Sequence, residues 1–563
     1  MFGKRSRGYQ ADELSPRTRF RANLEDLFLS NEVSGLRARD YFADGEAAGN
    51  VNFRRLARAG ASGQAPNHIH RDLLRTILKG CQWPKPYIFE IPVWSAKEQK
   101  MKTSKLAMLL PHELIRAICG KGDLATIFQT DGLSQDALHH LNEVQTKSGT
   151  AQLLGLGIWM DGTPCNWDRT KSVETVAMSL PGQVGQLANM RLPLTAIMKH
   201  HMVKRQTIDA ILLVVAWSMQ CAFQGTMPSS RHDGSAWHQS DSKRSKLASK
   251  TIGCQSVLVE VRADWACLKQ TFGFPGWRET RGCCFRCDIK PAEVSDASSW
   301  ASWRSPARRH THWSLMQQIV NQGQKISPLF SCPFMSSMQM AIDWLHCCDL
   351  GVAQDFLGNF FIYILTFLPG TNNDQRVAAL FLRMQSFYTR TKAESRLDDL
   401  SYAMLRKAGS AAPKLRSKAG ESRCLVPFAA ELARELLTDA TDTMQQTVKE
   451  CAVLLNRCYS CLTRATYVHE LLQQSSRKFC TLYAALAAAS DNLWTVKPKF
   501  HLWQELCEES TSCPATCWTY RDEDFGGSIA KLAHSRGGPS VAGACSFMVL
   551  QKFRARHSLP ALE

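Results

Sequence analysis

Three acidic residues, far apart in the sequence, each stand at the end of an apolar run or just beyond one. They are Asp161 in LLGLGIWMDGTP, Asp264 in SVLVEVRADWACL and Glu523 in CWTYRDEDFGGSIAKL. Carboxylates at the ends of strands can converge at one edge of a sheet, and Mg²⁺ prefers such hard oxygen ligands. Two Mg²⁺ ions held by two or three carboxylates can drive phosphodiester chemistry. The alternative for each acid taken alone is that it caps a turn or a helix.

A second group of residues has the types and spacing of a zinc site. Cys284 and Cys287 are separated by two residues, as are Asp343 and His346, and four such side chains can bind one structural Zn²⁺. Because Asp is a poorer structural ligand than Cys or His, three further cysteines stay open as substitutes: Cys283, Cys347 and Cys348. The alternative is that the paired thiols are small buried side chains in a reduced protein.

Two other candidates are interpreted as structural. Cys458 and Cys461 have the same spacing but lie in a helical pattern without a nearby His, so we assign them to the core. His501 in KPKFHLW can approach the acids or a DNA phosphate, but the preferred interpretation is a packed or hydrogen-bonded histidine.

The chain is basic, which favours a polyanionic partner such as nucleic acid. Its 563 residues include 68 Lys and Arg against 50 Asp and Glu, a net charge of +18. In the polar segment 231–250, basic side chains can contact phosphates and an indole can stack on an unpaired base: Arg231, Lys243, Arg244, Lys246 and Trp237. The basic segment 405–423, expected to be a loop, is a second candidate. For either segment the alternative is a solvated surface loop.

The cysteines and the N-terminus indicate a reducing compartment. There are 21 cysteines, an odd number, and the start MFGKRSRGYQ has no apolar signal core. We therefore expect reduced thiols in the cytosol or nucleus, and SKRSK is a weak nuclear-import patch. The longest apolar runs, 211–217 and 360–368, are far shorter than the ~20 residues that span a bilayer, so no membrane segment is expected.

The order of predicted elements suggests a fold class. Strands are expected at the run ending in Asp161 and at 172–181, 191–198 and 256–264, with a buried helix over 207–223 before the last of them. Three strands, a helix and a strand carrying an acid is the order of a ribonuclease-H-like fold. We predict an α/β mixed-sheet core interrupted by a large, mainly helical insertion. The expected regions are a basic, mainly helical 1–150, core 151–280, insertion 281–490, strand-then-helix core 491–535 and tail 536–563.

Several blocks together resemble CACTA/EnSpm-type or Plavaka-type DDE transposases over about residues 150–535. The blocks are DGTPCNWDRTKSVETVAMSLPG with RLPLTAI, VEVRADWACLKQTFGFPGWRETRGCCFRC, AIDWLHCCDLGV, KPKFHLW and CWTYRDEDFGGSIAKL. The resemblance implies that Asp161, Asp264 and Glu523 bind Mg²⁺ or Mn²⁺ and that the protein hydrolyses DNA and transfers strands. It also implies a nuclear location and a homo-oligomer, since active transposases commonly work as dimers or larger assemblies.

The third block departs from the family pattern. An aromatic residue usually precedes the Glu and a basic residue follows it, whereas Asp522 and Asp524 flank Glu523 here. The identity of the third ligand therefore stays open among these three acids. Two alternatives also stay open: a relative that binds DNA or another partner without cutting, and an unrelated basic helical interaction protein. The last of these predicts no strand-rich block at 151–275.

Overall fold

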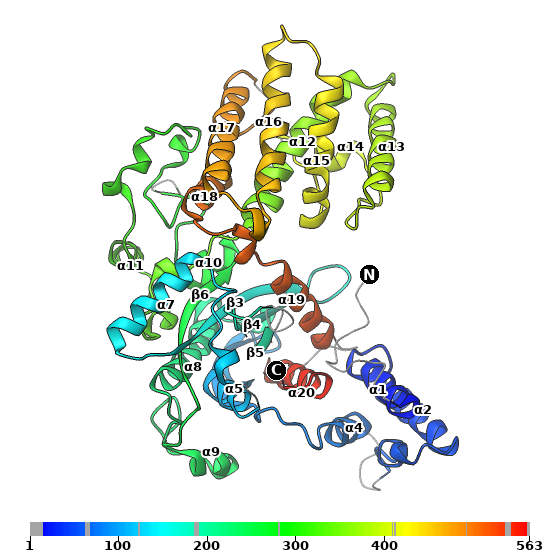
Figure 1. Cartoon of the computed structure of the whole chain (residues 1–563). Coiled ribbons are helices and arrows are strands. Elements are labelled where there is room, and N and C mark those ends of the chain that lie inside the picture. Colours follow the sequence, from blue (N-terminus) through cyan, green and yellow to red (C-terminus); the bar gives the residue numbers. More distant parts are fainter. Residues whose placement is uncertain are drawn as a thin grey trace.

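A four-stranded mixed sheet lies at the centre of the computed structural model (Figure 1). The structure describes residues 15–61, 68–121, 124–184, 191–279, 282–407, 409, 412–490, 492–534 and 542–559. The strands are β3 (Leu153–Pro164), β4 (Ser172–Ser179), β5 (Arg191–Met198) and β6 (Gln255–Ala263), in the order β5-β4-β3-β6. The strand-rich block predicted at 151–275 is confirmed, whereas the alternative of an unrelated helical protein predicted no such block.

Three of the strands form an antiparallel meander, and the fourth joins it in parallel. β3 pairs antiparallel with β4, and β4 with β5, whereas β6 runs parallel to β3 with Met160 opposite Ala263. Helix α8 (Lys204–Gln224) lies in the connection from β5 to β6, as a parallel pair requires. This is the buried helix that the apolar run at 207–223 predicts.

Helices cover both faces of the sheet, which explains the uninterrupted apolar character of β3. Val257 and Val259 of β6 pack with α7 (Gln135–Ser148), whereas Leu258 belongs to the main core with α8. An antiparallel hairpin of β1 (Tyr87–Ser95) and β2 (Lys100–Met108) also belongs to this part of the protein. Its other helices are α5 (Pro111–Cys119), α6 (Leu124–Ile127), α9 (Ser242–Leu247) and α10 (Trp265–Phe272).

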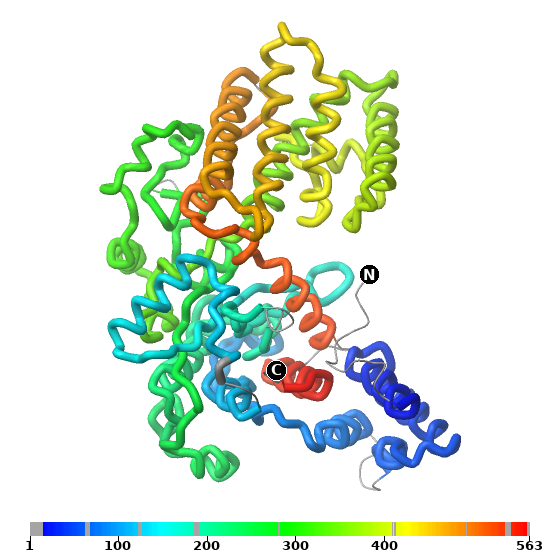
Figure 2. Tube along the Cα trace, in the orientation of Figure 1, coloured from blue at the N-terminus to red at the C-terminus, as the bar shows by residue number. Residues whose placement is uncertain are grey.

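The N-terminal helices have a hydrophobic core of their own. They are α1 (Pro16–Leu29), α2 (Gly35–Ala47), α3 (Arg54–Ala57) and α4 (Ile69–Ile77). The group lies beside the C-terminal helix α20 (Ala542–Arg556) (Figure 2). Asp26 forms an ion pair with Arg556, N···O 2.7 Å, and the Asn31 side chain donates to the carbonyl of His534 at 2.8 Å.

A helical insertion separates α10 from the last core helices. Residues 282–344 contain α11 (His312–Asn321) and several short 3₁₀ turns. A π-helical segment, η11 (Leu345–Val352), then continues directly into α12 (Ala353–Ile364). The remaining helices are α13 (Asn373–Thr391), α14 (Tyr402–Leu405), α15 (Ala419–Leu436), α16 (Thr443–Ser460) and α17 (His469–Ala488). The prediction of a mainly helical insertion therefore holds for 345–488 and less well for 282–344.

The C-terminal part differs from the sequence-based expectation. Residues 492–534 form α18 (Pro498–Glu509) and α19 (Tyr520–Ala533) and contain no strand, so the predicted strand-then-helix pattern is wrong there. The 536–563 region is not simply a tail, because α20 packs against β2 and β5. Burial of α20 residues such as Val549 and Leu550 makes this helix part of the core.

Two segments are long and apolar enough to cross a membrane by length and composition alone. They are Lys204–Gln224 and Leu345–Phe367, and 61% and 72% of their most apolar windows are buried within the protein. Core helices of soluble proteins meet the same criteria, so the two segments are weak evidence for a membrane span.

Candidate active site

The parallel pairing of β3 and β6 brings Asp161 and Asp264 to the same edge of the sheet. Met160 lies opposite Ala263, and each acid is the next residue along the chain. Asp161 is not at the end of its strand as expected, because β3 continues to Pro164 and pairs Asp161 with Thr175 of β4. Asp264 is also the N-cap of α10, where its Oδ1 accepts from the backbone N–H of Cys267 at 2.5 Å. The capping role and the site position therefore coexist in Asp264.

Helix α19 brings Glu523 to these two acids. The helix packs closely on β3 because Gly526 has no side chain: a Cβ there would lie 2.7 Å from Thr163 Oγ1 and 2.7 Å from Trp159 Cη2. Glu523 stands one helical turn before Gly526 and is only partly exposed. Its carboxylate interacts with that of Asp161.

The two acids that flank Glu523 have other surroundings. Asp522 is fully buried and pairs with Arg191 and with Arg262, the latter at N···O 3.3 Å. Asp524 is exposed. Of the three consecutive acids, Glu523 is therefore the one that faces Asp161.

The acids in this site disfavour one another's ionisation. Burial and the nearby charge of Asp264 raise the pKa of Asp161. Burial and the charge of Asp161 raise the pKa of Glu523 to about 8. Oε1 of Glu523 is buried and has no hydrogen-bond partner. A cation bound among these oxygens would relieve both the repulsion and the missing bond.

His346 faces the same site and is oriented by Asp343. Asp343 Oδ2 accepts from His346 Nδ1 at 2.6 Å and from Thr519 Oγ1 at 2.7 Å, and Oδ1 accepts from the Thr519 N–H at 2.9 Å. The other imidazole nitrogen, Nε2, is 3.7 Å from Glu523 Oε1. Burial alone would lower the pKa of His346, but the bond to Asp343 and the nearby acids raise it to about 9. His346 stands in the π-helical η11, an element frequent at functional sites.

An ion pair between a buried acid on β4 and an exposed lysine just after β5 also belongs to this site, and sequence analysis missed it. Glu174 of β4 is buried opposite Gly162, and its Oε2 lies 3.2 Å from Lys199 Nζ. Burial raises the pKa of Glu174, and the charges of Asp161 and Asp264 act in the same direction. The alternating pattern of β4 predicts a half-buried strand but does not distinguish this acid from an exposed one.

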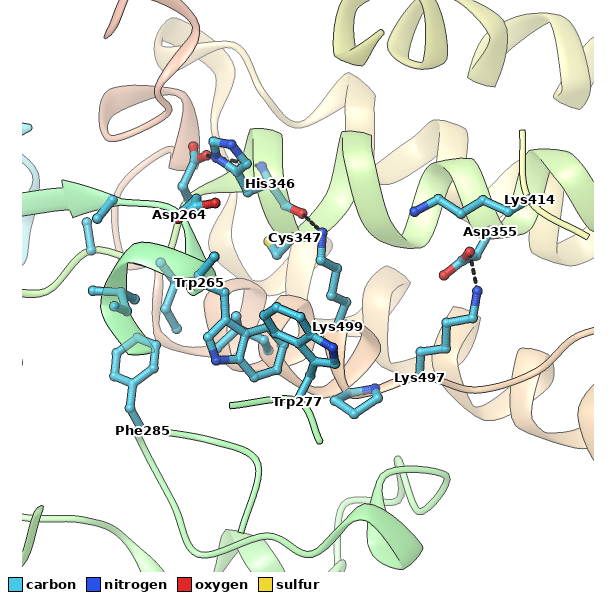
Figure 3. Close-up of a pocket in the computed structure, with 18 residues that line it drawn as sticks. Asp264, Trp265, Trp277, Phe285, His346, Cys347, Asp355, Lys414, Lys497 and Lys499 are labelled. Carbon is cyan, nitrogen blue, oxygen red and sulfur yellow. Dashed lines mark hydrogen bonds and ion pairs between the residues drawn. The ribbon is translucent and has the colours of Figure 1, made fainter. Parts of the chain in front are cut away.

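A cavity of about 370 Å³ opens next to Asp264 and His346 (Figure 3). Its walls carry three lysines, two indoles and a phenyl ring: Lys414, Lys497, Lys499, Trp265, Trp277 and Phe285. Lys499 Nζ donates to the His346 carbonyl at 2.7 Å, and Lys497 pairs with Asp355 at 2.6 Å. Lys414 comes from the 405–423 segment, whose residues 414–417 pack on α12 and the end of α14 rather than forming an open loop.

Four other buried side chains form a candidate metal site away from the three acids. Ligand atoms of Cys284, Cys287, His501 and Glu505 all lie within 4.8 Å of one another. This differs from the predicted zinc set: the cysteine pair is in the cluster, but Asp343 and His346 lie at the carboxylate site instead. His501, interpreted from sequence as a packed histidine, contacts Cys287 Sγ through Nε2 at 3.2 Å. Sequence analysis missed Glu505, which stands one helical turn after His501 on α18.

Two of the five residues predicted to contact nucleic acid are buried, and Trp237 is half-buried. Arg244 is buried and paired with Glu113, N···O 2.6 Å, and Arg231 is buried beside Asp241 at 3.2 Å. Trp237 packs in the same group, and its indole N–H donates to Pro228 O at 3.3 Å. Arg231 also donates to the carbonyl of Ile88 in β1 at 2.9 Å, so the two arginines fasten this segment to α5 and β1. Lys243 and Lys246 are exposed and keep the predicted accessibility.

Neither a scan against protein-family models nor a search of the curated proteins found a match to this chain. Its function has to be inferred from the geometry of its own residues.

Proposed function

We propose that this chain is a transposase-like enzyme with a ribonuclease-H-like core that cuts and joins DNA phosphodiester bonds. Asp161, Asp264 and Glu523 would hold Mg²⁺ or Mn²⁺. The observation that carries the proposal is the convergence of these three carboxylates from two strands and a distant helix. The strand order β5-β4-β3-β6, with β6 parallel to β3, supports the proposed core.

The donor set fits a hard divalent cation. Three carboxylates supply the oxygen ligands that Mg²⁺ and Mn²⁺ prefer. The raised pKa of Asp161 and the Glu523 Oε1, which accepts no hydrogen bond, mark oxygens that a bound cation would stabilise. When bound, such ions activate the attacking oxygen and stabilise the leaving one.

The surrounding side chains have supporting roles in this proposal. His346, with a pKa of about 9, is cationic at neutral pH and offsets negative charge beside Glu523. Asp343 and Thr519 fix its ring, and so hold that charge at one position. Lysines and indoles of the adjacent cavity suit a DNA strand, because ammonium groups contact phosphates and aromatic faces stack on bases.

The test is a cleavage assay on labelled duplex and single-stranded DNA with Mg²⁺ or Mn²⁺. The variants Asp161→Asn, Asp264→Asn and Glu523→Gln are expected to lose cleavage by at least about 100-fold, the scale on which groups that stabilise a transition state act. Asn is as good an N-cap as Asp, so the Asp264 variant keeps α10 intact. Asp524→Asn is the matched control and should cleave normally.

Two results would reject the catalytic proposal. Cleavage that survives all three substitutions would place the chemistry elsewhere. DNA binding without cleavage, equal in the native protein and its variants, would favour the alternative of a catalytically inactive, transposase-derived DNA-binding or interaction protein.

A further inference from the structure

We infer that Cys284, Cys287, His501 and Glu505 bind one structural Zn²⁺ that fastens α18 to the loop after α10. This site is separate from the three acids and does not depend on their proposed chemistry. Its four residues come from two segments that lie 214 residues apart at the Cys287–His501 contact.

Two of the distances between the ligand atoms are close to those around a tetrahedral ion. Zn–S bonds of ~2.3 Å and Zn–N or Zn–O bonds of ~2.0 Å place tetrahedral ligands roughly 3.3–3.8 Å apart. His501 Nε2 is 3.2 Å from Cys287 Sγ and 3.3 Å from Glu505 Oε1. The same imidazole nitrogen therefore faces a thiol and a carboxylate at ligand-to-ligand distance.

The local backbone also suits a bound thiolate. The Arg286 N–H donates to Cys284 Sγ at 3.2 Å, which stabilises negative charge on that sulfur. The neighbouring Cys283 takes no part, because its Sγ lies 3.7 Å from the Ile289 carbonyl. On the other side, Arg309 Nη1 lies 2.6 and 2.8 Å from the two Glu505 oxygens and holds that carboxylate in place.

The donor types select the ion. Two thiolates and an imidazole suit Zn²⁺, whereas Mg²⁺ prefers oxygen ligands only. All four residues are buried and together complete a fourfold shell, so no position is left for a substrate. The role is therefore structural.

The ion would hold two walls of the cavity beside Asp264. Phe285, between the two cysteines, lines the cavity from the loop. Lys499 and Leu502, which flank His501 in sequence, line it from α18. Loss of the ion would remove one link between these walls and leave the ion pairs of Arg309 with Glu505 and Glu509.

The test is the metal content of the full chain purified without chelators. We expect about one Zn²⁺ per chain by mass spectrometry, and a loss of at least tenfold in zinc occupancy in Cys287→Ser and in His501→Ala. Cys283→Ala, an adjacent buried thiol outside the cluster, should keep its zinc. Glu505→Gln should bind zinc more weakly under chelator competition.

A second measurement uses the native protein and therefore tests the inference even if the substituted proteins fail to fold. Native protein loaded with Co²⁺ should show the thiolate-to-cobalt charge-transfer and d–d absorption bands of a tetrahedral site. A folded native protein without zinc and without these cobalt bands would overturn the inference, as would a Cys284–Cys287 disulfide detected by peptide mass. Neither readout depends on DNA cleavage, so this inference and the proposed activity can fail separately.

Discussion

At the scale of single residues, Asp522, Glu523 and Asp524 show how neighbouring acids acquire different roles. Asp522 is buried between Arg191 and Arg262. Removing one partner from a buried ion pair typically costs about 3–5 kcal/mol, because the remaining charges lose their compensation. We expect Asp522→Asn to lower the free energy of unfolding by this amount in urea titrations, and Asp524→Asn to change it by less than about 0.5 kcal/mol. Equal stability of the two variants would contradict the burial of Asp522 between the two arginines.

Asp349 gives a pH-dependent prediction. Its carboxylate accepts hydrogen bonds from Tyr520, at 2.7 Å, and from Tyr459, but burial outweighs them and raises its pKa to about 7. Between pH 4 and 7 the folded protein keeps a proton here that the unfolded chain has lost. This group alone therefore lowers the free energy of unfolding by about 1.4 kcal/mol for each pH unit of increase.

The variant Asp349→Asn should remove that slope. Its stability relative to the native protein is expected to improve steadily from pH 4.5 to pH 7.5, measured by chemical unfolding at several pH values. A stability difference between the two proteins that does not vary with pH would show that Asp349 is ionised throughout.

The sequence was informative about residues whose surroundings are local. Asp161 and Asp264 could be found because each follows a strand-like run, and parallel pairing aligns them. His501 and Glu505 could not, because the thiols that face them stand more than 200 residues earlier. Arg244 was assigned to DNA because its partner Glu113 lies 131 residues away, and a basic segment looks exposed until its acids are known.

At the scale of elements, the approach of α19 to β3 depends on one glycine. A Cβ at Gly526 would lie 2.7 Å from both Thr163 Oγ1 and Trp159 Cη2, whereas one at Gly527 would meet no atom within 4 Å. Gly526→Ala is expected to lower the free energy of unfolding by about 1–3 kcal/mol through overpacking. It should also reduce any cleavage activity, because Glu523 moves with the helix.

Gly527→Ala is the matched control for this helix. With open space around it, the new methyl group should be neutral or stabilise the protein by up to about 1 kcal/mol, the difference in helix propensity. The measurement is the thermal unfolding of the Gly526→Ala and Gly527→Ala variants. Equal effects on stability would show that α19 does not pack tightly on β3.

Strands and helices with a clear period were predictable, and the segment before Glu523 was not. The four strands and α8 have long apolar patterns that the structure bears out. Region 491–535 was expected to run from strand to helix, and the aromatic residues of CWTY have a local preference for strands. In the structure this segment leads from a 3₁₀ turn at Pro514–Thr516 into α19, whose start is fixed by the bonds between Thr519 and Asp343. That tertiary contact overrides the local preference.

At the scale of the whole molecule, the C-terminal helix joins the core to the N-terminal helices. Ala107 N–H of β2 donates to Ser546 Oγ of α20 at 3.0 Å, and Arg556 pairs with Asp26. A chain ending at residue 534 lacks α20. It should therefore lose its cooperative thermal unfolding transition or melt at least about 10 °C lower, because the core and the N-terminal helices both lose the helix that packs against them. A chain ending at 559 should behave like the native protein. Comparable melting of the two truncated chains would show that α20 is dispensable.

The distance along the chain between Asp264 and Glu523 also matters while the protein is being made. The ribosome completes β3, β6 and the whole helical insertion before Glu523 leaves the exit tunnel. α20, the last core helix, follows later still. A nascent chain thus carries the first two acids before the third, and the site is complete only once α19 has joined β3.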